Sequence, residues 1–180
     1  PFRCDYGSHI YLGENFYANY ELIVLDQCDV RFGDNVMLGP RVSLFSAGHP
    51  LDADIRNAGL EYGKPITVGS NVWMGGCVTV NGGVTIGDNV VIGSGSVVTH
   101  DIPSNVIAAG NPCRVLRPLT DADRAHWQQE AARWRRAAGE AAGLCAAGML
   151  CRARAAGCAR CGHRRGPRLS RHFAAAERPG

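Results

Sequence analysis

A six-residue repeat constrains the fold of this chain more than any other feature of its sequence. An aliphatic residue or methionine recurs at every sixth position, at Val68, Met74, Val80, Ile86, Ile92 and Val98. Valine also returns four places on, at Val72, Val78, Val84 and Val90. Such repeats are typical of a parallel β-helix, in which short strands turn every six residues and each coil packs on its neighbours. The repeat therefore predicts an all-β fold.

The repeat is interrupted once. The same pattern appears earlier, with breaks, near residue 12 and over residues 32–43, whereas residues 45–65 lack it and contain several glycines and prolines. Glycine and proline favour turns and loops, and a loop of this length in a compact domain is usually functional. The sequence therefore predicts one excursion loop. Triplets such as Gly-Asp-Asn are expected at the corners of the coil, because Gly and Asn adopt positive φ at low cost.

The charge balance divides the chain near residue 120. Residues 1–120 carry 7 basic and 11 acidic side chains, whereas residues 121–180 carry 12 and 5. The second part has no Ile, Val or Tyr from which to build a core. We therefore expect the ordered domain to lie in the first part of the chain.

A short C-terminal helix is expected over residues 120–137. Thr120 can cap it, and Trp127 and Trp134 lie seven residues apart on one face. The Ala/Arg-rich tail over residues 138–180 predicts either disorder or an end of the chain translated out of register.

The tail also admits two functional interpretations. Arginines cluster over residues 164–171 and could contact nucleic acid, and Cys158, Cys161 and His163 have a spacing that could hold zinc. A C-x2-C pair without a second pair is a weak zinc signal. We therefore expect no nucleic acid partner and no metal.

The sequence also bears on location and redox state. No apolar run is long enough to span a bilayer, and no signal peptide is indicated, so we expect no membrane partner and a cytoplasmic location. Cys4, Cys28, Cys77 and Cys113 are scattered through a repeat that supplies its own core. Buried free thiols are therefore favoured over disulfides.

Several motifs together resemble one known family. They are Pro1-Phe-Arg-Cys-Asp-Tyr-Gly, Phe16-Tyr-Ala-Asn-Tyr, Gly48-His49-Pro50, Gly63-Lys-Pro-Ile, Asn71-Val-Trp-Met-Gly-Gly and Ala109-Gly-Asn-Pro-Cys-Arg-Val. Over residues 1–119 the chain resembles the maltose and galactoside O-acetyltransferases, which are hexapeptide-repeat acyltransferases. The resemblance implies a left-handed parallel β-helix domain over residues 1–119 and a homotrimer with active sites between neighbouring prisms. Members of this family usually begin with a helical segment, which we expect to be missing from this sequence.

The resemblance also implies a reaction, the transfer of an acetyl group from acetyl-CoA to a sugar hydroxyl of maltose, glucose or a galactoside. An alcohol is a poor nucleophile, so the reaction needs a general base. His49 stands where the family has its catalytic histidine, and Glu61 is the carboxylate expected to orient it. The alternative is a related acetyltransferase that uses a Nod-factor-like oligosaccharide, an amino sugar, serine or an antibiotic, because the acceptor pocket varies while the donor groove is shared.

The same resemblance assigns the other contacts. The acceptor-side residues it implies are Asn19, Asp5, Gln27 and Trp73, the last of which lines the cleft. Gly76 is expected to offer its backbone N–H to the oxyanion formed from the thioester carbonyl. The remaining contacts to CoA are expected at Ser94, Thr99, His100, Arg114 and Arg117, with the two arginines on the phosphates.

Two other functions fit the sequence less well. A zinc hydratase on the same coil would need converging histidines, but the coil region has only His9, His49 and His100, without a paired spacing. A purely structural β-helix would need neither the His49 loop nor the Asn-Pro-Cys-Arg ending.

Overall fold

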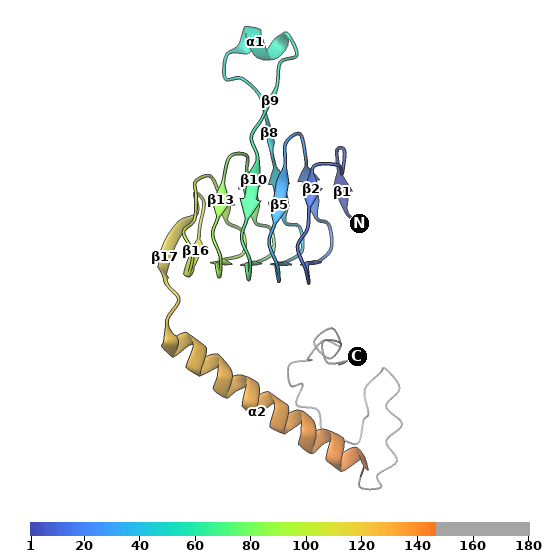
Figure 1. Cartoon of the computed structure of the whole chain (residues 1–180), viewed down its shortest axis with the longest axis vertical. Helices are drawn as coiled ribbons and strands as arrows, with labels where there is room; N and C mark the ends of the chain where they lie inside the picture. The colour runs from blue at the N-terminus through green and yellow to red at the C-terminus, as the bar shows by residue number, and fades with distance from the viewer. Residues whose placement is uncertain (147–180) are drawn as a thin grey trace. The chain divides into compact units, whose positions relative to one another are not determined.

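The computed structural model describes the backbone of residues 1–146 and the side chains of residues 1–138. The chain divides into two units, one from Pro1 to Asp123 and one that starts at Arg124. The first unit is a coil of short strands (Figure 1). Its coil strands are β1 (Arg3–Cys4), β2 (Ile10–Tyr11), β3 (Tyr17–Ala18), β4 (Ile23–Leu25), β5 (Val30–Phe32), β6 (Met37–Leu38), β7 (Ser43–Phe45), β10 (Ile66–Val68), β11 (Trp73–Met74), β12 (Thr79–Asn81), β13 (Thr85–Ile86), β14 (Val91–Ile92), β15 (Val97–Val98), β16 (Val106–Ala109) and β17 (Arg114–Pro118).

These strands form three sheets, which are the three faces of the coil. Sheet A has the order β1-β4-β7-β12-β15, sheet B has β13-β10-β5-β2, and sheet C has β17-β16-β14-β11-β6-β3. The pairs are parallel except for β16 with β17, which is antiparallel. Each turn of the chain visits sheets B, C and A in succession, so the predicted parallel β-helix is confirmed.

The repeated aliphatic residues form the core. Each of the six residues that define the beat, from Val68 to Val98, has at most 1% of its surface exposed. The four valines that return between them, from Val72 to Val90, are at most 2% exposed. Burial of apolar surface at about 25 cal/mol per Å² stabilises the stack. Every coil adds a layer of apolar side chains to one continuous cluster. This explains why the six-residue repeat is strict.

Three edges join the faces, and we name them by the sheets that they connect. At the BC edge an asparagine ends each corner with a φ between 54° and 62°, at Asn15, Asn35, Asn71, Asn89 and Asn105. Side-chain amides bond from coil to coil, as from Asn15 to Asn35 (3.1 Å) and from Asn35 to Asn71 (3.2 Å). The Gly-Asp-Asn triplets therefore form corners as predicted, and asparagine also links the coils.

Glycine has a different role just before these corners. A Cβ atom at Gly69 would lie 2.8 Å from the backbone carbon of Gly87 in the next coil and within 2.9 Å of the Asp88 nitrogen. The backbones of successive coils therefore approach too closely for a side chain at this position.

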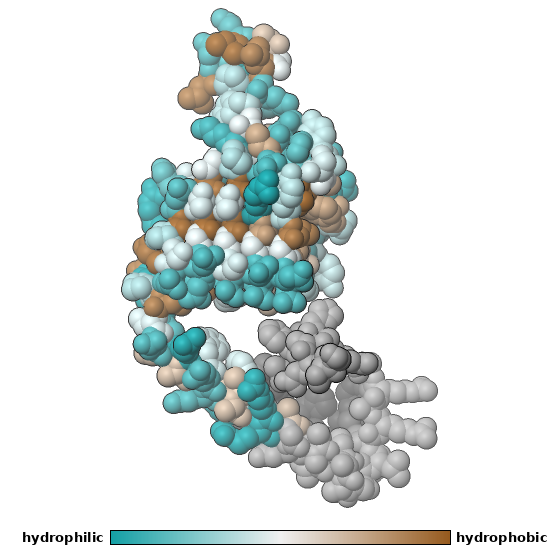
Figure 2. Space-filling model, viewed as in Figure 1, coloured by the Kyte–Doolittle hydropathy of each residue, from teal (hydrophilic) through white to brown (hydrophobic). Residues whose placement is uncertain are grey.

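The excursion loop leaves at the AB edge between β7 and β10. It contains β8 (Ala47–Gly48) and β9 (Tyr62–Gly63), which pair antiparallel, and α1 (Ala53–Asn57). Asp52 caps α1 by accepting a hydrogen bond from the Ile55 N–H (3.0 Å). Nothing in α1 is buried, and hydrophobic residues lie exposed at the far end of the excursion (Figure 2).

The helix α2 (Asp121–Ala146) follows the coil. Thr120 and Asp123 form a capping box, in which the Asp123 N–H donates to Thr120 Oγ1 (3.3 Å) and the Thr120 N–H donates to Asp123 Oδ2 (2.9 Å). The rings of Trp127 and Trp134 lie 6.1 Å apart on one face, as predicted.

The helix extends past residue 137, where the sequence suggested that it would end. Residues 137–146 contain five alanines, and alanine has the highest helix propensity, so local preference favours continuation of the helix. No helix among residues 1–146 is long and apolar enough to cross a bilayer. The predictions for the tail from residue 147 on, including the zinc spacing and the arginine cluster, lie outside the described residues.

The cysteines of the coil are free, as predicted, but only one of them is fully buried. Cys113 is buried, and burial raises the pKa of its thiol. Cys4 and Cys77 are exposed and Cys28 is partly buried. The prediction of buried thiols is wrong for the two exposed residues, because Cys4 lies on the first strand and Cys77 at a corner, where side chains point outward.

Candidate active site

His49 stands at the mouth of the excursion, directly after β8. The antiparallel strands β8 and β9 form a two-stranded ribbon, in which Gly48 pairs with Tyr62. His49 directly follows Gly48 and Glu61 directly precedes Tyr62, so the two residues come next along the ribbon. The imidazole is exposed, and its Nδ1 lies 3.4 Å from the Leu60 carbonyl oxygen. A carbonyl only accepts, so this contact requires a proton on Nδ1 and leaves the lone pair of Nε2 free. That is the tautomer of a general base.

Glu61, the carboxylate predicted to orient His49, is bonded to the coil in this structure, and its role toward His49 stays a prediction. Its Oε1 accepts a hydrogen bond from Gln27 Nε2 at 2.9 Å. The reason is the packing of the ribbon on the corner after β4, where a Cβ on Gly63 would lie 2.4 Å from Cys28 Sγ. This close approach brings Glu61 within reach of Gln27. The carboxylate therefore ties the excursion to the coil, and the Leu60 carbonyl contacts the imidazole.

Asp26, beside Gln27, organises the first residues of the chain. Its carboxylate is fully buried and accepts hydrogen bonds from the backbone N–H groups of Asp5 (3.1 Å), Tyr6 (3.0 Å), Gly7 (2.7 Å) and His9 (3.3 Å). Burial raises the pKa of Asp26, but these N–H donors more than offset it and hold the pKa below its ordinary value.

Two neighbours of Asp26 share this corner. His9 donates from Nδ1 to the Asp26 carbonyl oxygen at 2.7 Å. The side chain of Asp5, a predicted acceptor contact, is exposed, and the Asp5 N–H is one of the donors to Asp26. The sequence did not single out Asp26 as an anchor, and its only signal was an acidic residue at a position where the repeat buries apolar ones.

A second group of predicted residues lies at the CA edge. Asn19 follows β3 and its Oδ1 accepts from the Tyr20 N–H (2.7 Å), which leaves the amide nitrogen available. Gly76 follows β11 two coils further along, and its carbonyl accepts from the Gly95 N–H (2.9 Å). No partner of the Gly76 N–H is found among the described residues. Ser94 is exposed in the next coil at the same corner position.

Trp73 lies on the outer surface of sheet C. It is 52% exposed, pairs with Met37 on one side and Val91 on the other, and Met37 pairs in turn with Tyr17. Tyr17 and Met37 are 40% and 39% exposed. The three side chains form an apolar row that crosses the strands of sheet C, and Asn19 lies two residues beyond Tyr17.

The remaining donor-side residues separate into two places. Arg114 pairs with Ala109 at the end of β16, which places it near the CA edge. Its Nη1 donates to the Cys113 carbonyl (2.8 Å). Thr99 and His100 instead lie at the AB edge, where the Thr99 hydroxyl and His100 Nδ1 are 2.8 Å apart.

Arg117 is held by a residue that the sequence had not connected with it. Asp123 accepts from Arg117 Nη1 (2.7 Å) and Nη2 (2.8 Å), and this pairing lowers the pKa of the carboxyl far below its ordinary range. Asp123 is also the third residue after Thr120, so the capping-box pattern was the signal that could have identified it.

One chain does not bring all these residues together. The excursion that carries His49 leaves the coil at the AB edge, where Gln27, Thr99 and His100 also lie. Asn19, Gly76 and Ser94 lie at the CA edge. The width of sheet A separates the two edges, and six residues at about 3.3 Å each span at most about 20 Å. A cleft that contains both groups requires the AB edge of one coil to face the CA edge of another.

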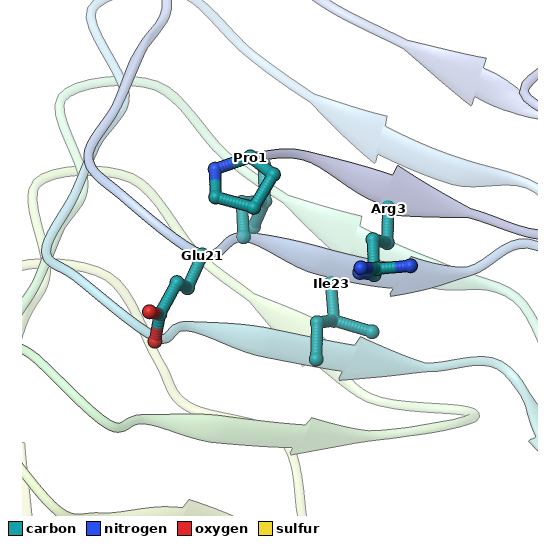
Figure 3. A pocket seen from close by; sticks show the side chains of 5 residues that line it. Pro1, Arg3, Glu21 and Ile23 are labelled. Atoms are coloured by element: carbon teal, nitrogen blue, oxygen red, sulfur yellow. The ribbon is translucent and has the colours of Figure 1, made fainter.

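A pocket formed by other residues lies at the start of the coil (Figure 3). Pro1, Arg3, Glu21, Leu22 and Ile23 line it, from β1, β4 and the corner before β4. None of the residues predicted for the site lines it. Among the side chains that the structure describes, those of residues 1–138, no group of three or more His, Cys, Asp and Glu is placed to hold a metal ion.

Comparisons with known proteins define the class of this chain. Residues 65–100 match the family model "Bacterial transferase hexapeptide (six repeats)". A galactoside O-acetyltransferase of Escherichia coli is 52% identical over 127 residues, which are 71% of this chain and 63% of that protein. The fold is thus the left-handed parallel β-helix of hexapeptide transferases, as predicted.

Two solved structures extend the likeness. The maltose O-acetyltransferase from Clostridium difficile 630 is 58% identical with a TM-score of 0.66, over 67% of this chain and 64% of that chain. The hexapeptide-repeat acetyltransferase VCA0836 from Vibrio cholerae is 38% identical with a TM-score of 0.66, over 67% of this chain and 68% of that chain. VCA0836 has also been solved in complex with acetyl-CoA.

The chain belongs to the hexapeptide-repeat acetyltransferase family that includes the maltose and galactoside O-acetyltransferases, so the resemblance is confirmed. It spans about 63% of the length of the Escherichia coli galactoside O-acetyltransferase.

Proposed function

We propose that this protein transfers an acetyl group from acetyl-CoA to a hydroxyl of a sugar. The family supports the reaction class, and the geometry of His49 carries the proposal. Its Nδ1 lies 3.4 Å from the Leu60 carbonyl oxygen, which favours the tautomer that leaves Nε2 able to accept a proton. The likeness to galactoside and maltose O-acetyltransferases favours a glycoside acceptor.

The reaction then proceeds by direct transfer. Nε2 of His49 takes the proton of the sugar hydroxyl as its oxygen forms a bond to the acetyl carbonyl carbon. The unpartnered N–H of Gly76 stabilises the oxyanion. The bond from carbon to sulfur breaks, and the proton returns from the imidazole to the thiolate of CoA. The products are an acetylated sugar and free CoA.

The acceptor side is proposed around Asn19, Asp5, Gln27 and Trp73. The amide of Asn19 has donors available for sugar hydroxyls, and the exposed row of Tyr17, Met37 and Trp73 offers a flat apolar surface for a sugar ring. Glu61 is proposed as a positioning residue, because its bond to Gln27 fixes the base of the loop that carries His49.

The donor side is proposed along the CA edge, with Ser94 and Arg114 beside Gly76. Thr99 and His100 at the AB edge contact the same CoA molecule only if a second chain brings its AB edge to this groove. Arg117 completes the set on β17, where it contacts a CoA phosphate.

We further propose that the active unit is a homotrimer. The excursion carries apolar side chains that its own chain does not cover: Leu51, Ile55, Leu60 and Tyr62 are 98%, 47%, 53% and 48% exposed. Cyclic assembly that seats the AB edge of one prism on the CA edge of the next would cover them and unite the two halves of the site. The cytoplasmic location stays a prediction, which cell fractionation would test.

The test is release of free thiol from acetyl-CoA with maltose, glucose and galactosides as acceptors. Replacing His49 with Ala should lower turnover by about 10² to 10⁴ and leave CoA affinity nearly unchanged. His126→Ala, which removes an exposed histidine of α2, is the matched control and should retain full activity. Equal turnover in the His49 variant would contradict the assigned role.

A second candidate function differs only in the acceptor. Gln27 stands beside the buried Asp26 at the corner where the acetyl acceptor is proposed to bind. Its side chain is an uncharged amide, which can both donate hydrogen bonds to and accept them from the acceptor molecule. Serine, an amino sugar and chloramphenicol belong in the same assay. Thiol release with one of these and not with sugars would favour this alternative.

A further inference from the structure

Arg117, which is proposed to contact a CoA phosphate, is held by a residue in the first turn of α2. Arg117 lies at the end of β17 and Asp123 lies in the first turn of the helix. Between them the backbone is anchored to the coil, since the Leu119 N–H donates to the Asn105 carbonyl (2.8 Å). The pair therefore joins the last strand of the coil to the helix that follows.

The contact uses one particular edge of the guanidinium. Nη1 and Nη2 donate to the two oxygens of Asp123 at 2.7 and 2.8 Å, so the carboxylate meets the guanidinium end-on. Nη1 also donates to the Pro118 carbonyl oxygen (3.0 Å). The guanidinium has a second pair of parallel donors, the N–H of Nε and the other N–H of Nη2, which we call the side-on fork. This pair has no partner among the described residues. A phosphate is bound well by two parallel N–H donors of this kind.

The carboxylate is itself held firmly. Asp123 Oδ2 also accepts from the Thr120 N–H (2.9 Å) and the Thr120 hydroxyl (2.8 Å). Its bonds to Arg117 and Thr120 keep it ionised. A long arginine side chain normally loses rotamer freedom when it binds an anion, and here that freedom is already lost before binding.

We propose that Asp123 is a positioning residue, which fixes Arg117 so that its side-on fork faces a phosphate of the acetyl-CoA donor. The inference rests on the proposed function, and it adds that the first turn of α2 contributes to donor affinity through Arg117. The carboxylate offsets part of the positive charge, but it removes the conformational cost of ordering the side chain. We expect the conformational effect to be the larger one, so that loss of the carboxylate weakens CoA binding.

The test is calorimetric measurement of CoA affinity for the full chain and four variants. Asp123→Asn should weaken CoA binding by about two- to tenfold, which is the effect of freeing one ordered side chain. Arg117→Ala should weaken it as well, and Asp123→Asn should add nothing in the Arg117→Ala background. Asp121→Asn makes the same charge change in the same turn and should leave affinity unchanged.

Each contrary result is distinct. CoA binding by Asp123→Asn that equals or exceeds that of the wild type would overturn the inference, as would a loss that persists without Arg117 or that Asp121→Asn reproduces. Unchanged affinity in Arg117→Ala, with normal binding by the wild type, would overturn it while the proposed function stands. Failure of the wild type to bind CoA would overturn both. Circular dichroism of each variant verifies that α2 is intact.

Discussion

At the scale of single residues, Asp26 has the largest structural role that the sequence did not reveal. Its buried carboxylate is the shared acceptor for the backbone N–H groups that turn the chain between β1 and β2. Replacing Asp26 with Ala leaves these donors without a partner, and each such loss costs about 1–3 kcal/mol. We expect the free energy of unfolding in urea to fall by at least about 3 kcal/mol.

The control is Asp29→Ala, which removes an ion pair with Arg31 whose arginine side chain is half exposed. That change should alter stability by no more than about 1 kcal/mol. The pH dependence gives a second readout. Because the pKa of Asp26 is lowered on folding, its contribution is present above the ordinary carboxyl pKa of about 4 and is lost as the pH falls below it. Equal acid sensitivity of wild type and Asp26→Ala would contradict this account.

At the scale of elements, the close stacking of coils predicts the effect of a single methyl group. Gly69→Ala would place a Cβ against the backbone of the next coil at Gly87 and Asp88, which cannot move without displacing the stack. We expect a loss of about 1–3 kcal/mol in the free energy of unfolding. Thr67→Ala, on the exposed side of β10 just before Gly69, should cost less than about 1 kcal/mol. Similar losses for the two variants would show that the coils can separate locally.

The excursion loop carries the proposed base, His49, but has no share in the core. All its residues from Leu51 to Lys64 are exposed, and α1 buries nothing. Replacing residues 49–61 with Asn-Gly should join β8 and β9 as a tight hairpin and leave the thermal unfolding midpoint nearly unchanged. Thiol release should be abolished, because His49 is lost with the loop. A large drop in the midpoint would mean that the loop supports the coil.

The elements were predictable where the sequence repeats and less so where it does not. The six-residue repeat from Val68 to Val98 predicts the strands, because burial on the inner side of each coil permits little variation in the spacing of the apolar residues. The bond from Gln27 to Glu61 was not predictable, because it depends on how closely the ribbon approaches a corner 34 residues away. The end of α2 was misplaced because alanine continues a helix without the periodic pattern that marks one.

At the scale of the whole molecule, the distribution of site residues over two edges is the main finding. Family motifs identify His49, Asn19 and Gly76 in the sequence, but the motifs do not reveal that His49 and the other two lie at opposite sides of sheet A. That separation follows from the register of the strands. Under the proposed function, an active site would therefore take its base from one chain and its contacts from Asn19 and Gly76 from another.

Complementation between two inactive variants tests this claim most directly. His49→Ala and Asn19→Ala are co-expressed in equal amounts, and thiol release from acetyl-CoA is compared with that of each variant alone. If the site lies between chains, random mixing gives one intact base and one intact acceptor contact at about a quarter of the interfaces, so about a quarter of wild-type activity should return. Activity no higher than the mean of the two variants would show that each site is built within a single chain.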